Sequence, residues 1–126
     1  MVFNVLTGNT DDHARNHAAF WNGANLSLTP AYDICPQARL GREANQAMLI
    51  TDNDKRSKLE TCRLSAPNFL INDRDARELI AYQIETITRL WPAICDEAEI
   101  STVDRTYLWR RQFLNDYAFE GYGDAV

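Results

Sequence analysis

The sequence predicts one mainly helical α+β domain, residues 1–126, with a small β-hairpin near its N-terminal end. Two patterns carry this prediction. Apolar residues recur at three- and four-residue intervals between Asn72 and Ile94, as on one face of a long helix. The run Asn22-Gly23-Ala24-Asn25 separates two short apolar segments, and its Asn-Gly pair supplies the positive φ angles of a tight hairpin turn. A length of 126 residues suits a single domain with a single core.

The N-terminal part of the chain is expected to combine a short apolar element, a polar loop and the hairpin. Residues 1–6 form an apolar run, too short for periodicity to separate helix from strand. The hairpin strands are expected at 18–21 and 26–29, and Pro30 ends the second because proline cannot donate to a strand ladder. A hairpin in this position would return Asp33 to the side of Asn16.

The middle of the chain has weaker patterns. Residues 34–44, which contain Pro36 and Gly41, are expected to form a loop or a short helix. Residues 46–50 read as a strand or extended segment that enters a polar turn at 51–54. Alternating charge over 55–66 favours a helix that stops before Pro67.

Two helices are expected to close the chain. The first begins at Asn72 or Asp73, either of which is a good cap, and Pro92 predicts a kink or break inside it. The second begins at Ser101 and ends before Gly121, and 121–126 is expected to fray. Trp109 is expected in the core, as are the members of the apolar stripe on the first helix, which are Ile80, Ile84, Ile87, Trp91 and Ile94.

Composition and charge exclude several classes of protein. A net charge of -5 argues against a broad surface for nucleic acid or for an anionic membrane. The three cysteines form no Cys-x-x-Cys pair, so neither a disulfide framework nor a zinc ribbon is indicated. No signal-peptide pattern and no membrane-length apolar run is present, so we expect a cytoplasmic protein without direct nucleic-acid or membrane partners.

The densest group of chemically capable side chains lies between Gly8 and Asn16. It offers a carboxylate at Asp11 and a carboxamide at Asn16, five positions later, with a further carboxylate at Asp33. In protein kinases a catalytic-loop Asp accepts the proton of the substrate hydroxyl, and an Asn five residues later and a following Asp hold magnesium. The spacing therefore indicates phosphoryl transfer.

Residues 8–16, followed by the run Leu-Thr-Pro-Ala-Tyr-Asp at 28–33, resemble the core of the HipA family, bacterial serine/threonine kinases that are toxins of type II toxin–antitoxin pairs. The resemblance implies a protein-kinase-like C-terminal lobe in which the hairpin accompanies the catalytic loop and the Tyr-Asp pair. It implies ATP and magnesium as cofactors. It implies Asp11 as the catalytic aspartate, with His13 and Arg15 beside it, and Asn16 and Asp33 as the ligands of metal and cofactor.

Family members carry an N-terminal region with a nucleotide-covering loop, a phosphate-contacting lysine and a regulatory serine, whereas this sequence starts at the catalytic loop. We therefore expect a kinase C-lobe without its N-lobe, inactive in isolation. We expect apolar side chains among Met1, Val2, Phe3, Val5 and Leu6 to be exposed and to favour self-association or capture by a partner. The partners implied are a translation-related protein substrate and either a separately encoded N-lobe or the antitoxin.

Several alternatives stay open. His13 and His17, with Asp11 or Asp12, could form a zinc site, although no third histidine exists. Arg15 either balances charge near the phosphates or makes a local ion pair. Small-molecule kinases usually place His where this chain has Asn9. The whole chain could instead be a catalytically inactive, partner-binding module. A loose basic segment is either a partner surface or solvated, and it comprises Arg39, Arg42, Lys55, Arg56 and Lys58.

Overall fold

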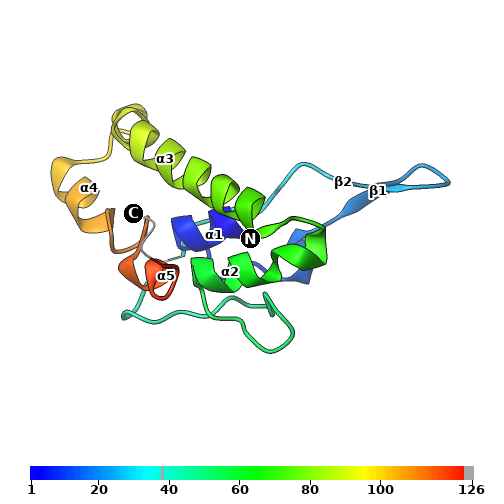
Figure 1. Ribbon diagram of the computed structural model, residues 1–126. Helices are drawn as coiled ribbons and strands as arrows, with labels where there is room; N and C mark the ends of the chain where they lie inside the picture. The colour runs from blue at the N-terminus through cyan, green and yellow to red at the C-terminus, as the bar shows by residue number, and fades with distance from the viewer. Residues whose placement is uncertain (38, 124–126) are drawn as a thin grey trace.

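The computed structural model describes residues 1–37 and 39–123 and is mainly helical with one two-stranded sheet (Figure 1). The short helix α1 packs against both α2 and the long helix α3. The predicted class, mainly α with a small hairpin, is confirmed. The elements in chain order are α1 Val2–Thr7, η1 Ala14–Asn16, β1 Ala19–Trp21, β2 Leu26–Leu28, α2 Leu59–Ser65, η2 Ala66–Phe69, α3 Asp73–Glu97, α4 Thr102–Leu108 and α5 Asp116–Phe119.

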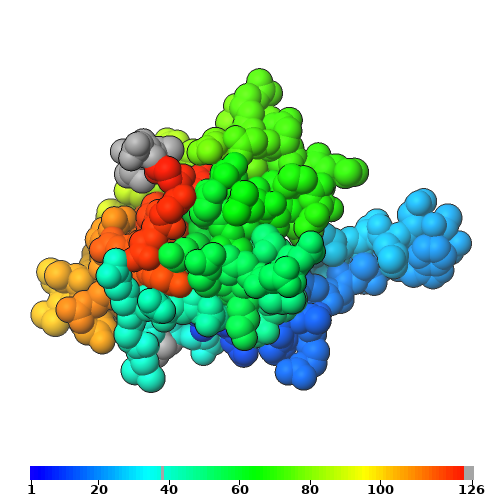
Figure 2. All heavy atoms as spheres, turned by 60° about the horizontal axis from the view of Figure 1, so that its bottom comes forward, coloured from blue at the N-terminus to red at the C-terminus, as the bar shows by residue number. Residues whose placement is uncertain are grey.

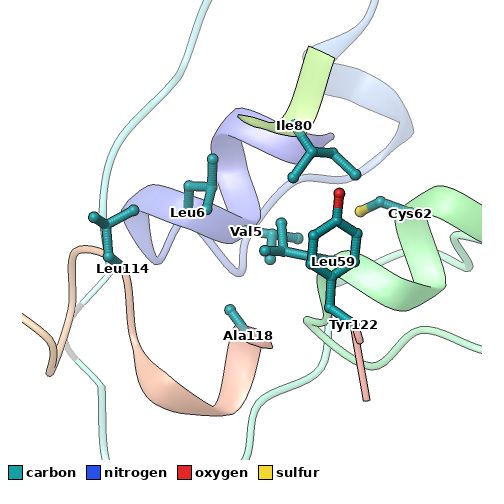
Figure 3. Close-up of a cluster of buried hydrophobic side chains, with 8 residues drawn as sticks. All are labelled: Val5, Leu6, Leu59, Cys62, Ile80, Leu114, Ala118 and Tyr122. Carbon is teal, nitrogen blue, oxygen red and sulfur yellow. The ribbon is translucent and has the colours of Figure 1, made fainter. Parts of the chain in front are cut away.

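The core forms around α1, where side chains from both ends of the described chain meet (Figure 3). Of the N-terminal apolar residues expected to include exposed side chains, Phe3 is exposed, whereas Val5 and Leu6 have no exposed surface and belong to the core. Tyr122 is buried as well, although a frayed tail was expected from residue 121; residues 124–126 lie outside the described part. The cluster comprises Val5, Leu6, Leu59, Cys62, Ile80, Leu114, Ala118 and Tyr122.

Helix α1 ends at Gly8 in the left-handed conformation, with φ 74°. Glycine adopts this conformation without the penalty that a Cβ brings. A Cβ here would also lie 2.9 Å from the backbone oxygen of Gln112, so space as well as backbone geometry favours glycine. Gly8 therefore turns the chain out of the core helix and into the polar loop.

The predicted hairpin is confirmed, with Ala19 opposite Leu28 and Trp21 opposite Leu26 in an antiparallel register. Its turn spans residues 22–25, as the expected strand bounds imply. Four residues separate the strands, and the side-chain oxygen of Asn22 accepts hydrogen bonds from the backbone N–H groups of Ala24 and Asn25, at 3.0 and 2.8 Å. The hairpin projects from the rest of the molecule, and its strand residues are exposed (Figures 1 and 2).

Helix α3 begins as predicted, because the side chain of Asn72 accepts a hydrogen bond from the N–H of Asp75 at 2.9 Å. The helix continues through Pro92 to Glu97, so the break expected at that proline is wrong. Ile94, expected in the core, is exposed, and Cys95 is buried in its place. The buried stripe thus advances from Trp91 by four residues rather than three.

The single helix predicted from Ser101 to Gly121 is two short helices. The cap at Ser101 is confirmed, since its hydroxyl accepts a hydrogen bond from the N–H of Asp104 at 3.1 Å. The chain then turns between α4 and α5, and Leu114 takes a positive φ of 52°. This turn lets the N–H of Leu114 donate to the carbonyl oxygen of Leu6 at 2.7 Å. A straight helix could not make this contact with α1.

Two aromatic contacts join α3 to this turn. The ring of Trp91 lies 5.2 Å from that of Trp109 and 4.8 Å from that of Phe113, centroid to centroid. Tilted rings at such distances favour packing. Trp91 and Trp109, both predicted in the core, therefore pack with each other and are half-buried.

The middle of the chain is less regular than predicted. Residues 46–50 form no strand; isolated bridges pair Asn45 with Arg56 and Thr51 with Asp54. The helix expected over 55–66 begins only at Leu59, and the 3-10 turn η2 carries the chain across Pro67. The described part of 34–44 is loop. Among the described helices, none combines the length and apolar character that a membrane crossing needs.

Candidate active site

A buried polar network holds the loop that follows α1. Asn4, on α1, donates to a carboxylate oxygen of Asp12 at 2.7 Å and accepts from the side chain of Asn9 at 3.2 Å. The side chain of Asn9 in turn accepts from the backbone N–H of Asp11 at 3.2 Å. All three network side chains, Asn4, Asn9 and Asp12, are buried. Because buried polar groups are costly when unpaired, the network fixes the path of the loop relative to α1.

The hairpin returns the chain so that Asn16 and Asp33 meet. The Nδ2 of Asn16 donates to a carboxylate oxygen of Asp33 at 2.5 Å, and the Oδ1 of Asn16 accepts from the backbone N–H of His13 at 3.1 Å. Asp33 has a left-handed backbone, with φ 54°, and Asn9 Nδ2 lies 3.5 Å from its carbonyl oxygen. The predicted juxtaposition of Asn16 and Asp33 is therefore present.

The three residues expected around the reacting groups differ in their surroundings. Asp11 is exposed. Arg15 lies with its Nη2 3.3 Å from Nε2 of His13, and its carbonyl oxygen accepts from the hydroxyl of Tyr32 at 2.6 Å. Among the described residues Arg15 makes no ion pair with Asp11 or Asp12, so the local ion pair considered for it is not found.

His13 and His17 have different partners. The ring of His17 contacts the carboxylate of Asp12 at 2.7 Å, whereas that of His13 contacts Arg15. Within residues 1–37 and 39–123, no three His, Cys, Asp or Glu side chains are grouped so that they could hold a metal ion. The zinc alternative therefore finds no support in the geometry.

A pocket of about 290 Å³ opens beside Asn16 and Asp33. Its polar wall includes Asp12 and its apolar wall includes Phe3 and Leu28. The pocket between the polar loop and the hairpin is thus lined on one side by oxygen-bearing side chains and on the other by apolar ones. Such a mixed lining suits a ligand with a charged end and an apolar body.

Sequence reasoning did not identify the buried side chains that support this site, which are Asn4, Asn9 and Asp12. The sequence suggested Asp12 only as a possible zinc ligand, yet it is 1% exposed and bridges α1 to His17. One signal was available. Asn4 is the polar residue inside the apolar run 1–6, and a polar residue on a buried helix face needs a partner.

Fold and site together define a helical domain in which a polar loop and a hairpin meet at one pocket. The chain matches the family model described as HipA-like C-terminal domain over residues 1–91. It is 31% identical, over 121 residues, to the serine/threonine-protein kinase toxin HipA of Shewanella oneidensis. No solved structure gives a significant match.

The family match covers more than half of the chain, and the chain therefore belongs to the HipA-like C-terminal domain family. The alignment with the Shewanella protein covers 87% of this chain but only 28% of that protein. The chain thus corresponds to less than a third of its relative's length.

Proposed function

We propose that this chain is the catalytic C-terminal lobe of a HipA-like serine/threonine-protein kinase, which transfers the γ-phosphoryl group of ATP to a protein hydroxyl once an N-terminal lobe completes the site. The observation that carries the proposal is the 2.5 Å contact between Asn16 and Asp33, residues 17 positions apart, in the pocket next to the loop that bears Asp11. The family match and the similarity to a serine/threonine-protein kinase toxin support the same activity.

The donor set at Asn16 and Asp33 fits magnesium. Mg²⁺ prefers oxygen ligands and is usually held by one or two protein groups together with water and substrate phosphates. The Asn16 carboxamide faces Asp33 with its Nδ2, while its oxygen accepts from the backbone N–H of His13. To share a cation with Asp33, the carboxamide would therefore turn its oxygen toward Asp33. When bound there, the ion would neutralise charge on the phosphates.

The other site residues have separate roles in this proposal. Asp11 accepts the proton of the substrate hydroxyl; its carboxylate is exposed and so can reach a protein substrate. Asn9 positions it by accepting from its backbone N–H while lying against the carbonyl of Asp33. His13 positions Asn16 through its backbone N–H, and Arg15 lies within hydrogen-bond distance of Nε2 of His13, where it contributes positive charge near the phosphates.

A phosphotransfer assay tests the proposal. The isolated chain is expected to be inactive, because these groups cannot orient a triphosphate without a nucleotide-gripping lobe, and fusion to an N-lobe of the family should confer transfer from ATP. In that fusion Asp11→Asn should lower the rate by about 10²–10⁴-fold. Asp33→Ala should abolish metal-dependent nucleotide binding.

Two controls sharpen the assay. Asp52→Asn, an exposed carboxylate in the 51–54 turn, should leave the rate unchanged. Asp12→Asn should lower the rate less than Asp11→Asn; equal losses in equally folded proteins would show that Asp11 is not the base. A fusion that binds ATP and metal but never transfers phosphate would refute the proposed kinase activity.

A partner-binding module without catalysis is the second candidate, and the hairpin favours it. Phe20, Trp21, Leu26 and Leu28 are all more than 60% exposed on a hairpin that projects from the body. Two-stranded hairpins are only marginally stable alone in water, and exposed apolar patches mark interfaces. Under this reading the N-lobe or an antitoxin covers the hairpin, and the fusion described above stays inactive.

A further inference from the structure

A second hollow, of about 480 Å³, shares no lining residue with the candidate active site. It lies where the segment after residue 38 passes beside α4 and α5, at the side of the molecule where teal, orange and red meet in Figure 2. Four arginines line it: Arg39, Arg42, Arg110 and Arg111. We call it the arginine hollow.

The carboxylates near the arginine hollow neutralise only part of this charge. Arg42 forms an ion pair with Glu120, and Nη2 of Arg110 lies 2.7 Å from a carboxylate oxygen of Asp116. Among the described residues, neither Arg39 nor Arg111 has a carboxylate partner. On a chain of net charge -5, the hollow is therefore a local basic site.

Arg39 has an unmet hydrogen-bonding requirement. Its Nη2 donates to the carbonyl oxygen of Arg42 at 2.6 Å, but its Nη1 is buried and has no partner among the described residues. Burial lowers the pKa of Arg39, since a low-dielectric surrounding disfavours the charged form. Arg39 also lines the hollow, so its guanidinium adds positive charge to this wall.

An apolar shelf continues from the hollow along α4. The guanidinium of Arg111 lies 4.8 Å from the ring centre of Tyr107, which lines the hollow. Val103 and Tyr107 are exposed and line a shallow depression that shares Tyr107 and Arg111 with the hollow. Arginine and tyrosine are the side chains that most often dominate protein–protein contacts. A charged group and an apolar group could thus be bound side by side.

We propose that the arginine hollow binds an acidic peptide segment of a partner protein. A carboxylate of the segment contacts Arg39 and Arg111, and an adjacent apolar side chain packs on Val103 and Tyr107. Charge complementarity selects an anion, and bidentate guanidinium contacts suit a carboxylate. The apolar shelf favours a peptide over nucleic acid, whose backbone offers phosphate at every step but no apolar side chain. The proposal does not depend on catalysis by Asp11.

Fluorescence anisotropy of the full 126-residue chain tests this directly. The probe is a fluorescein-labelled peptide in which glutamates flank one leucine; the comparison probes replace glutamate by glutamine, or are a DNA duplex. The acidic peptide should bind about tenfold or more tightly than the glutamine peptide, and added salt should weaken it. Equal binding of the two peptides, or binding of the duplex in preference to the acidic peptide, would overturn the proposal.

Variants locate the binding site. Arg111→Gln removes an exposed side chain and should weaken the acidic peptide about tenfold without changing the melting temperature. Arg39→Gln should weaken it at least as much. Arg89→Gln, an exposed arginine of α3 outside the hollow, is the matched control and should have no effect. If Arg39→Gln does not fold, Arg111→Gln decides, and unchanged affinity in that variant rules out the hollow as the site.

Discussion

Replacing Asp12 should destabilise the fold around this site more than replacing its exposed neighbour Asp11. Its carboxylate is 1% exposed and accepts from Asn4 at 2.7 Å, and it contacts His17 at the same distance. Asp12→Ala would leave the buried amide of Asn4 without its acceptor, a cost of about 1–3 kcal/mol, and would remove a second, charge-assisted hydrogen bond. We expect the free energy of unfolding to fall by about 3 kcal/mol, a large share of the usual total.

Urea unfolding followed by circular dichroism measures this change. Asp12→Asn keeps an oxygen for Asn4 and should cost about 1 kcal/mol. Asp11→Asn is the matched control, because the Asp11 side chain is exposed; it should change the free energy of unfolding by no more than about 0.5 kcal/mol. If Asp12→Ala unfolds at the same urea concentration as the parent chain, the buried network does not stabilise the loop and our account of it is wrong.

Two further predictions concern the turns that frame the fold. Gly8→Ala should lower the free energy of unfolding by about 2 kcal/mol, and by more than Gly41→Ala does. Both positions have a positive φ, but only at Gly8 would an added Cβ meet the backbone of Gln112. Thermal unfolding of both variants tests this. Hydrogen bonds from Arg56 lower the pKa of Asp54 to about 2. Because the pKa of Asp54 is lower in the native state, its ionised carboxylate stabilises the fold fully above its unfolded pKa near 4, and this stabilisation is lost as the pH falls toward 2. In urea unfolding across that pH range, Asp54→Asn should therefore lose less stability with falling pH than the parent chain. An equally steep decline in the variant would contradict this.

Features set by neighbouring residues were predictable from the sequence. Asn22 and Gly23 encode the hairpin, and Asn72 starts α3, because turns and caps depend on side chains a few positions away. The meeting of Asn16 and Asp33 follows from the hairpin between them. The chemistry of this pair and of Asp11 stays a prediction.

Features set by distant residues were not predictable in the same way. The burial of Val5 and Leu6 depends on contacts with the far part of the chain, and so does the turn at Leu114 that divides the last helix in two. Periodicity indicates that a helix has an apolar face, but it does not show which distant segment packs against that face. It therefore gave one long helix where the backbone bond from Leu114 to Leu6 requires a turn.

The composition of the core also bears on how this domain is made. The family match ends at residue 91, yet Leu114, Ala118 and Tyr122 supply part of the cluster around Val5 and Leu6. Residues 5 and 6 leave the ribosome before residue 122, so this cluster cannot be complete until the segment that carries Tyr122 has emerged. Until then Val5 and Leu6 lack the part of their cover that Leu114, Ala118 and Tyr122 supply. The cooperative folding unit is thus longer than the region by which the family is recognised.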